Sequence, residues 1–198
     1  MLNLKKVAVT GGLSSGKSSV CRIFKELGAH CVSADEIVHQ LLTPRSELGK
    51  KVVELLGSDI VVQGRIDRSK IAEKVFSNLP LLQSLENILH PAVREEVEKE
   101  YQKANKLNQA KLFVVEIPLL FESGFGHFDA VIAVVADESV CLKRFTKTTN
   151  YAPEEFVKRM SRQLSQEEKA RRAQFVIMND GSLDDMRRAV INIYTKLT

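Results

Sequence analysis

The stretch Gly11-Gly12-Leu13-Ser14-Ser15-Gly16-Lys17-Ser18 lies between a short apolar run, residues 7–9, and a helical pattern. Its spacing is G-x-x-x-x-G-K-[ST], and a preceding strand and a following helix are the context in which that spacing forms a phosphate-binding loop. Glycines let successive N–H groups turn toward phosphate oxygens, and the positive end of the helix faces the same anion. Lys17 supplies a charge for the terminal phosphates, and the Ser18 hydroxyl is placed to bind Mg²⁺. The stretch therefore predicts a nucleoside triphosphate site.

The composition is that of one compact globular unit with room for an inserted subdomain, in a chain of 198 residues. A net charge of +4 suits a small anionic substrate and is too weak to indicate nucleic acid. The three cysteines lack C-x-x-C spacing, so we expect reduced packing residues. No apolar run has membrane-spanning length, and residues 1–6 leave no room for a signal peptide. We expect a cytoplasmic monomer without a nucleic-acid or membrane partner.

Five short apolar runs predict the strands of a central parallel sheet, at residues 6–10, 30–33, 112–117, 130–135 and 175–178. The helix after the loop ends at Gly28 and has apolar residues at i, i+3, i+4 and i+7, namely Val20, Ile23, Phe24 and Leu27. Strand-helix-strand crossovers are right-handed, so the carboxyl ends of the first two strands share one edge. Asp35, just beyond the second strand, is therefore expected near the phosphate loop.

The strand signal vanishes between Glu36 and about Lys111, where the pattern is helical and is bent or broken near His90-Pro91. Such an insertion is typical of an acceptor-binding module. A later helical stretch is rich in basic residues: Lys143, Arg144, Lys147, Lys158, Arg159 and Arg162. We expect a three-layer α/β fold with a nucleotide-binding core at 1–35, 111–137 and 168–198, a helical acceptor domain at 36–110 and a helical lid at 138–167.

Phosphoryl transfer needs positioning, charge neutralisation and a group that orients or deprotonates the acceptor. Asp35 is the best acceptor-side carboxylate, and its alternative role is the N-cap of a helix that starts at Glu36. Glu116 ends a strand at the same edge and could hold magnesium through water. Arg144 and Arg159 are the basic residues that we select to neutralise phosphate charge. His90 either contacts substrate or is a hydrogen-bonded structural histidine.

Two large classes of phosphate-loop protein lack support in this sequence. A GTPase carries an N-K-x-D signature, and Asn105-Lys106-Leu107-Asn108 lacks the aspartate; no D-x-x-G occurs either. A motor ATPase has a strand that ends in two acids, whereas Glu116 is followed by Ile117-Pro118. The early loop, the helical insertion and the late basic segment favour a small-molecule kinase.

The chain resembles the dephospho-coenzyme A kinase family nearly from end to end. The residues that carry the resemblance are the loop from Thr10 to Ser18, Ala34-Asp35, Gly64-Arg65-Ile66-Asp67-Arg68, Leu89-His90-Pro91, Ile117-Pro118-Leu119-Leu120-Phe121-Glu122, Arg159 to Gln163 and Asn179-Asp180-Gly181-Ser182. The loop is generic to nucleotide enzymes, and the Pro118–Glu122 run and the Asn179–Gly181 run are more selective. The resemblance implies a P-loop NTPase fold.

The resemblance also implies that the γ-phosphoryl group of ATP is transferred, with Mg²⁺, to the ribose 3′-hydroxyl of dephospho-coenzyme A. Asp35 matches the acid that orients or deprotonates this hydroxyl. The segments that face the acceptor contain Arg68, His90, Pro118, Leu119 and Leu120. Arg144 matches a lid-helix arginine, and Asn179 to Gly181 matches the stretch near adenine. The expected ATP-binding set is the loop from Gly11 to Ser18 with Ser19, Arg159, Asn179 and Gly181.

Two positions depart from the family pattern. Ser33 stands where the family has the first aspartate of its Asp-Ala-Asp motif, and Thr148 stands where many members carry a lid arginine. The alternatives to a dephospho-coenzyme A kinase are a nucleoside or nucleotide monophosphate kinase of the same architecture, and a nucleotide-binding regulator without turnover.

Overall fold

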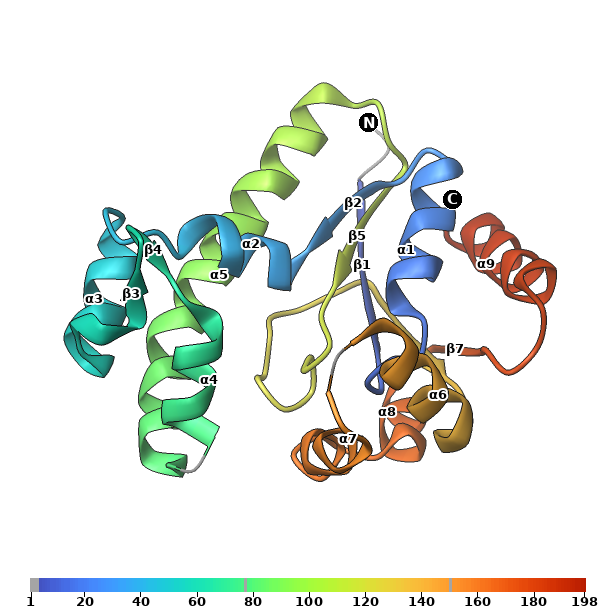
Figure 1. Ribbon diagram of the computed structural model, residues 1–198. Helices are drawn as coiled ribbons and strands as arrows, with labels where there is room; N and C mark the ends of the chain where they lie inside the picture. The colour runs from blue at the N-terminus through green and yellow to red at the C-terminus, as the bar shows by residue number, and fades with distance from the viewer. Residues whose placement is uncertain (1–3, 77, 150) are drawn as a thin grey trace. The chain divides into compact units, whose positions relative to one another are not determined.

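The computed structural model describes residues 4–76, 78–149 and 151–198. The chain divides into two compact units (Figure 1). Unit 1 comprises Met1–Ser33 and Glu100–Thr198, and unit 2 comprises Ala34–Lys99. In this division, residues 100–110 of the acceptor segment expected at 36–110 fall in unit 1. No helix among the described residues is long and apolar enough to cross a membrane.

Unit 1 is built on a five-stranded parallel sheet of order β2-β5-β1-β6-β7. Its strands are β1 (Lys5–Gly11), β2 (His30–Ser33), β5 (Leu112–Glu116), β6 (Ala130–Val135) and β7 (Phe175–Met178). The predicted parallel sheet is confirmed. β1 lies at its centre, where Val7 pairs with Val114 on one side and with Ala130 on the other. A strand that is covered on both faces needs the continuous apolar run that its sequence provides.

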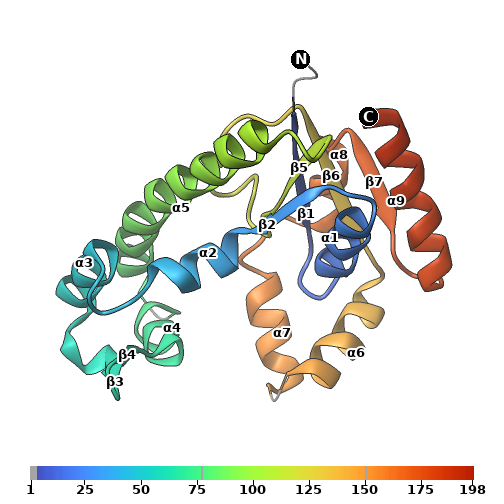
Figure 2. The ribbon, with the colours of Figure 1, turned by 90° about the horizontal axis from the view of Figure 1, so that it is seen from above.

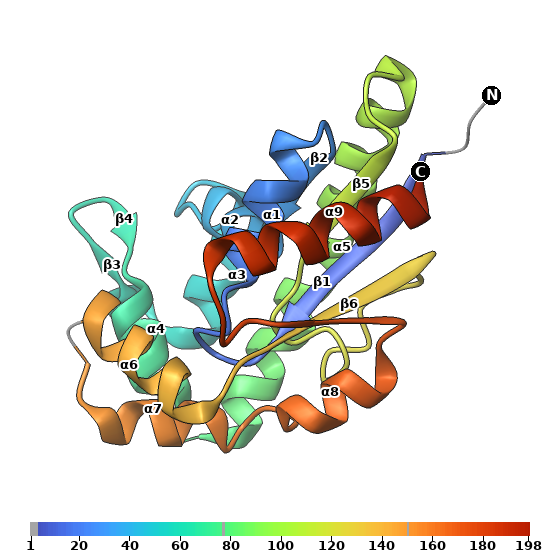
Figure 3. The ribbon, with the colours of Figure 1, turned by 90° about the vertical axis from the view of Figure 1, so that its right-hand side faces the viewer.

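Helices cover both faces of this sheet. Helix α1 (Lys17–Glu26) and helix α9 (Leu183–Leu197) pack together on one face, and helix α8 (Gln166–Arg172) packs against β6 and β1 (Figures 2 and 3). Phe24 of α1 and Val190 of α9 are buried in one cluster with the strand residue Ile132. The expected three-layer α/β arrangement is therefore confirmed, and it leaves the carboxyl ends of the strands as one edge.

The helix ends of unit 1 follow local capping chemistry. Ser182 and Asp185 form a capping box at the start of α9, and Asp137 accepts a hydrogen bond from the Ser139 N–H at the start of helix α6 (Glu138–Thr148). Helix α7 (Pro153–Met160) begins at Pro153, whose fixed φ angle suits the first position of a helix. Short caps of this kind determine where each helix begins, and hence which residues remain in the loops at the sheet edge.

Unit 2 has its own apolar core. It contains helix α2 (Ala34–Leu41), helix α3 (Glu47–Leu56), the 3₁₀ turn η1 (Ser58–Ile60), helix α4 (Arg68–Phe76) and the first part of helix α5 (Leu79–Leu107). The buried residues of this core are Leu42, Val52, Leu56, Ile60, Ile71, Val75 and Leu85. Asp67 accepts hydrogen bonds from the N–H groups of Ser69 and Lys70, so it caps α4.

Two expectations for this region need correction. The insertion is not purely helical, because β3 (Val61–Val62) and β4 (Arg65–Ile66) form an antiparallel hairpin around Gln63-Gly64. Two-residue strands are too short to produce an alternating pattern, whereas the left-handed turn does leave a sequence signal. Of the expected bend or break near His90-Pro91, the break is contradicted, because helix α5 runs continuously through Pro91. Burial of Val93 and Val97 outweighs the one backbone hydrogen bond that proline removes.

Candidate active site

The loop from Gly11 to Lys17 connects the end of β1 to the start of α1. At Gly11 the backbone passes close to β6, and an added Cβ would lie 2.1 Å from the carbonyl oxygen of Val134. Gly16, which precedes α1, has a left-handed backbone with φ near 100°. A side chain at either position would therefore disturb the loop. The loop residues bring the N-terminus of α1 to the carboxyl edge of the sheet, which is where an anion binds in such folds.

The ammonium group of Lys17 lies over this loop. Its Nζ donates hydrogen bonds to the carbonyl oxygens of Gly12 at 2.7 Å and Gly11 at 3.2 Å, and the residue is only 8% exposed. A lysine that is restrained by loop carbonyls is already placed next to the loop amides. It can exchange these contacts for phosphate oxygens without crossing the molecule.

Ser18 and Glu116 form a pair of hard oxygen donors beside the loop. Ser18 Oγ donates a hydrogen bond of 2.8 Å to Glu116 Oε1. The two residues meet because β1 and β5 are neighbours and Glu116 pairs in register with Val9. Mg²⁺ prefers a hydroxyl, a carboxylate and phosphate oxygens as ligands, so this donor set fits the ion. The two residues that were selected separately as magnesium candidates are thus in contact.

Asn179 and Arg144 join the loop to the end of β7 and to α6. Asn179 is 3% exposed, and its Nδ2 donates a 2.7 Å hydrogen bond to the carbonyl oxygen of Ser15. Arg144 Nη2 donates to the Asn179 carbonyl oxygen at 2.9 Å. The other terminal nitrogen of Arg144, Nη1, and the hydroxyl of Ser15 are buried and have no hydrogen-bond partner within the described part of the chain. Such buried polar atoms need an explanation, and a bound ligand is one. Gly181 lies in the exposed turn just beyond.

Two buried polar residues of α8 support the same edge, and the sequence analysis missed both. The side-chain amide of Gln166 donates to Ala136 O at 2.8 Å and accepts from Ala136 N at 3.0 Å, and it packs against Gly12. Lys169 is fully buried, and its Nζ contacts Glu122 at 3.0 Å and the Pro118 carbonyl oxygen at 2.8 Å. Burial lowers the pKa of Lys169, and Glu122 opposes that shift. Helix α8 is rich in charged residues, and nothing in the sequence distinguishes Gln166 and Lys169, which are buried, from the charged residues beside them that face solvent.

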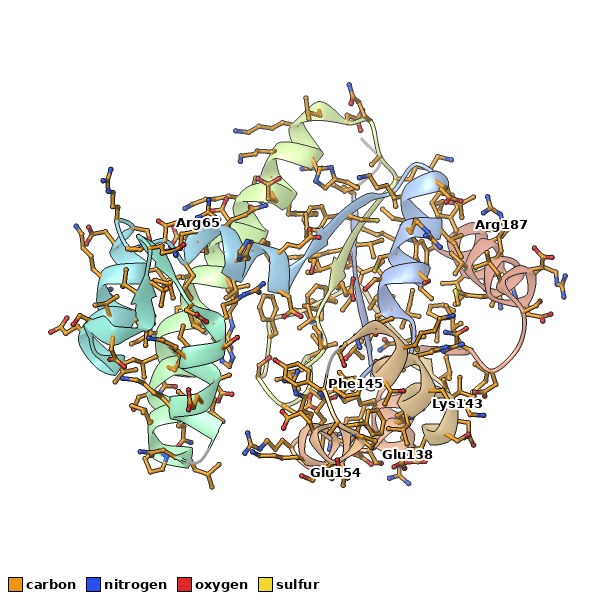
Figure 4. The ribbon with its side chains drawn as sticks, in the orientation of Figure 1. Arg65, Glu138, Lys143, Phe145, Glu154 and Arg187 are labelled. Atoms are coloured by element: carbon orange, nitrogen blue, oxygen red, sulfur yellow. The ribbon has the colours of Figure 1, made fainter. Side chains whose placement is uncertain are left out.

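Helices α6 and α7 form a small aromatic cluster that includes Phe145, Phe156 and Tyr151, and Leu13 of the loop packs against it. Figure 4 shows that Phe145 lies on the α6 side of this group while Lys143 lies toward the outer surface. Arg159 is held on α7 by a 2.8 Å ion pair with Glu155 and lies 4.6 Å from the centre of the Tyr151 ring. Its guanidinium is therefore positioned by Glu155 of the same helix and by the Tyr151 ring.

The Pro118-Leu119-Leu120 segment follows β5 at the same edge. The Pro118 carbonyl oxygen accepts hydrogen bonds from Thr10 and Lys169, and Leu120 is buried. Pro118 and Leu119 are partly exposed. Pro118 is thus fixed beside the strand that leads into the phosphate loop.

Asp35, Arg68 and His90 belong to unit 2. Asp35 is exposed and follows the end of β2 by two residues. The alternative N-cap role needs correction, because α2 starts at Ala34 and Asp35 lies inside its first turn. Arg68 is exposed at the start of α4. His90 is partly buried, and this burial lowers its pKa; Glu86 opposes the shift and Arg94 adds to it.

Comparison with known proteins places this geometry in a family. The family model CoaE, described as dephospho-CoA kinase, matches residues 5–185. A dephospho-CoA kinase of Protochlamydia amoebophila (strain UWE25) is 52% identical over 199 residues, which cover 100% of this chain and 98% of the relative.

Two solved structures have the same fold over nearly the whole chain. TT1252 from Thermus thermophilus has a TM-score of 0.84 and 31% identity, covering 99% of both chains. The dephospho-CoA kinase from Campylobacter jejuni has a TM-score of 0.69 and 30% identity, covering 97% of this chain and 96% of that one. The family model and the relative both match nearly the whole chain, and the chain has the phosphate loop with its paired serine and glutamate. The chain therefore belongs to the dephospho-CoA kinase family.

Proposed function

We propose that this protein transfers the γ-phosphoryl group of ATP to the ribose 3′-hydroxyl of dephospho-coenzyme A, which yields coenzyme A and ADP. The observation that carries the proposal is the loop from Gly11 to Ser18, with Lys17 over its carbonyls and Ser18 paired with Glu116. This arrangement lies in a chain whose length matches dephospho-CoA kinases almost completely. The reaction is the ATP-dependent phosphorylation of an alcohol.

On the nucleotide side, the loop amides and Lys17 bind the triphosphate, and Ser19 follows them in the first turn of α1. Ser18 would hold Mg²⁺ directly and Glu116 through water; the bound ion neutralises charge on the phosphates. Arg144 is proposed to contact ATP, since its buried Nη1 has no hydrogen-bond partner among the described residues. Arg159 adds a second guanidinium, and the turn from Asn179 to Gly181 lies at the same edge of the sheet as the loop.

On the acceptor side, Asp35 is proposed to orient the 3′-hydroxyl and to accept its proton. The hydroxyl oxygen forms a bond to the γ-phosphorus while the bond from that phosphorus to the β–γ bridging oxygen breaks, and ADP carries the electron pair away. Arg68, His90, Pro118, Leu119 and Leu120 are the proposed acceptor-binding residues. Lys17 and Arg144 stabilise charge that develops on the transferred group.

The proposed division of labour follows the expected segments. Residues 36–110 form the acceptor-binding domain, and residues 138–167 form a lid that closes over the nucleotide. The aromatic cluster of α6 and α7 supports the lid assignment, because it gives these helices packing of their own beside Leu13. A lid that excludes water protects the transferred group from hydrolysis.

An acceptor screen tests the proposed reaction. Purified protein with ATP and Mg²⁺ is expected to release ADP with dephospho-coenzyme A and to produce coenzyme A, identified by mass spectrometry. Phosphorylation of a nucleoside or a nucleoside monophosphate instead would favour the alternative kinase. Tight ATP binding without phosphorylation of any acceptor would favour a regulator. The monomeric state, the cytoplasmic location and the lack of a nucleic-acid or membrane partner stay predictions from the sequence, and light scattering and cell fractionation test the first two.

A further inference from the structure

Asn179 occupies a position beneath the phosphate loop. Its Nδ2 donates a 2.7 Å hydrogen bond to the Ser15 carbonyl oxygen, across 164 residues of sequence. The Asn179 side chain fits only because residue 16 is a glycine. A Cβ added at Gly16 would lie 2.1 Å from Asn179 Nδ2. The loop and the asparagine are therefore fitted to each other at the residue that precedes Lys17.

The asparagine is itself held in place from two sides. Its backbone N–H donates to Val135 O at 2.7 Å, which continues the pairing of β7 with β6. Its carbonyl oxygen accepts the 2.9 Å hydrogen bond from Arg144 of α6. Only 3% of Asn179 is exposed, so its amide is oriented by the protein and not by solvent. A buried, fixed donor is able to determine the conformation of the loop carbonyl that it contacts.

We infer that Asn179 is a positioning residue for triphosphate binding, acting through Ser15 and not on the base of the nucleotide. Holding the Ser15 carbonyl down turns the neighbouring loop N–H groups toward the phosphates before the ligand arrives. Preorganised donors of this kind improve binding because the loop loses little freedom when the ligand binds. The inference rests on the proposal that this loop binds the triphosphate of ATP.

Inorganic tripolyphosphate provides the test, because it has neither base nor ribose. Calorimetry with Mg²⁺ measures the Kd of tripolyphosphate and of ATP for the full chain and for Asn179→Ala. Loss of the loop hydrogen bond is expected to raise both Kd values by the same factor, about tenfold. A Kd for tripolyphosphate that stays unchanged while that for ATP rises would overturn the inference, since the side chain would then act on the nucleoside. Unchanged values for both ligands would overturn it as well.

A second variant keeps the shape of the side chain and adds a characteristic pH dependence. In Asn179→Asp an ionised carboxylate faces the Ser15 carbonyl oxygen, whereas the protonated acid can donate a hydrogen bond to it. Burial favours the protonated form. We therefore compare the Kd for tripolyphosphate of Asn179→Asp with that of the unsubstituted protein at each pH. The ratio of the first Kd to the second is expected to fall as the pH is lowered from about 8 to about 5. A ratio that stays well above one and does not change with pH would contradict the inferred hydrogen bond.

Gln174→Ala is the matched control, because it removes a side chain–backbone hydrogen bond at the opposite end of β7. Gln174 Oε1 accepts a 2.7 Å hydrogen bond from the Val131 N–H. Tripolyphosphate affinity is expected to remain within about twofold of the unsubstituted protein. Circular dichroism and thermal unfolding report whether each variant is folded. The tripolyphosphate test does not depend on the result of the acceptor screen. Dephospho-coenzyme A could fail as an acceptor while tripolyphosphate binding still depended on Asn179.

Discussion

At the scale of single residues, Asp35 is the carboxylate on which the proposed chemistry depends. It is exposed in the first turn of α2, where an acid stabilises the helix by about 0.3–1 kcal/mol. Asp35→Asn is expected to lower kcat about a hundredfold or more, and to lower the free energy of unfolding by less than about 1 kcal/mol. Steady-state kinetics with dephospho-coenzyme A and chemical denaturation measure the two effects.

Glu36→Gln is the matched control for this prediction. Glu36 is also an exposed acid in the first turn of α2. It should show the same small change in stability with kcat nearly unchanged. Equal kinetic effects of the two substitutions would mean that Asp35 contributes only its charge at the helix terminus.

The contact between Ser18 and Glu116 leads to a prediction about magnesium. Because the hydroxyl and the carboxylate lie 2.8 Å apart beside the loop, we expect them to bind the ion as a unit. Ser18→Ala and Glu116→Gln should each raise the Mg²⁺ concentration for half-maximal activity, by about tenfold. Ser19→Ala should change the KM for ATP and leave the Mg²⁺ requirement as it was. If Mg²⁺ titrations of Ser18→Ala and Ser19→Ala coincide, the metal assignment of Ser18 is wrong.

The cysteines are expected to be chemically inert in the folded protein. All three are free thiols, and burial raises the pKa of Cys31 to about 12 and those of Cys21 and Cys141 in the same direction. At pH 8 only about one Cys31 side chain in ten thousand is then a thiolate, which is the reactive form. Iodoacetamide should modify the native protein far more slowly than the protein in guanidinium chloride. Rapid alkylation of native Cys31, detected by peptide mass spectrometry, would contradict this expectation.

At the scale of elements, α8 illustrates how a polar helix acquires a buried role. Lys169 is fully buried and joins α8 to the segment after β5 through Glu122 and Pro118. Glu122 also accepts a hydrogen bond from the Leu164 N–H, which ties the connection between α7 and α8 to the same point. Breaking a buried ion pair leaves a charge without compensation and costs about 3–5 kcal/mol.

Lys169→Met is therefore expected to lower the free energy of unfolding by about 3 kcal/mol, measured by urea denaturation. Lys50→Met provides a control, because Lys50 forms an exposed pair with Glu47 on α3. That substitution should change stability by less than about 1 kcal/mol. Simultaneous replacement of Glu122 by Gln should recover part of the loss in Lys169→Met, since the unpaired carboxylate is then removed. A loss no larger than that of Lys50→Met would show that the buried pair is not structurally important.

At the scale of the whole molecule, the proposed catalytic cycle requires the lid segment to close over ATP. Thr148 is exposed at the end of α6, and its hydroxyl donates to the Arg144 carbonyl oxygen at 2.8 Å. An arginine in place of this threonine could bind phosphate oxygens in a bidentate manner. Thr148→Arg is expected to lower the KM for ATP about fivefold, equivalent to about 1 kcal/mol.

Thr146→Arg is the matched control for this whole-molecule prediction. Thr146 is also exposed on α6, and its hydroxyl donates to the Leu142 carbonyl oxygen at 3.1 Å. Two residues along a helix place it on a different face, so its arginine should leave the KM for ATP unchanged. An equal effect of the two substitutions would mean that added charge alone, and not a lid contact, changes ATP binding. No effect of Thr148→Arg would contradict the lid role.

The sequence by itself determined the parallel sheet and the phosphate loop. These features depend on patterns within a few residues of one another: the apolar run of β1 and the glycines of the loop. Continuity of α5 through Pro91 could not be predicted in this way, because it depends on burial of the residues beyond the proline. The two-residue strands of the hairpin were too short for a periodic signal.

Only the tertiary structure decided how the candidate residues combine. Ser18 meets Glu116 across 98 residues, and Asn179 meets Ser15 across 164. Gln166 supports Gly12, and Lys169 joins Glu122, because α8 packs against β6 and β1. Residue type and spacing describe what a side chain is able to bind. Which distant partner it reaches depends on how strands order themselves and on which helix face is buried, and these are properties of the packed molecule.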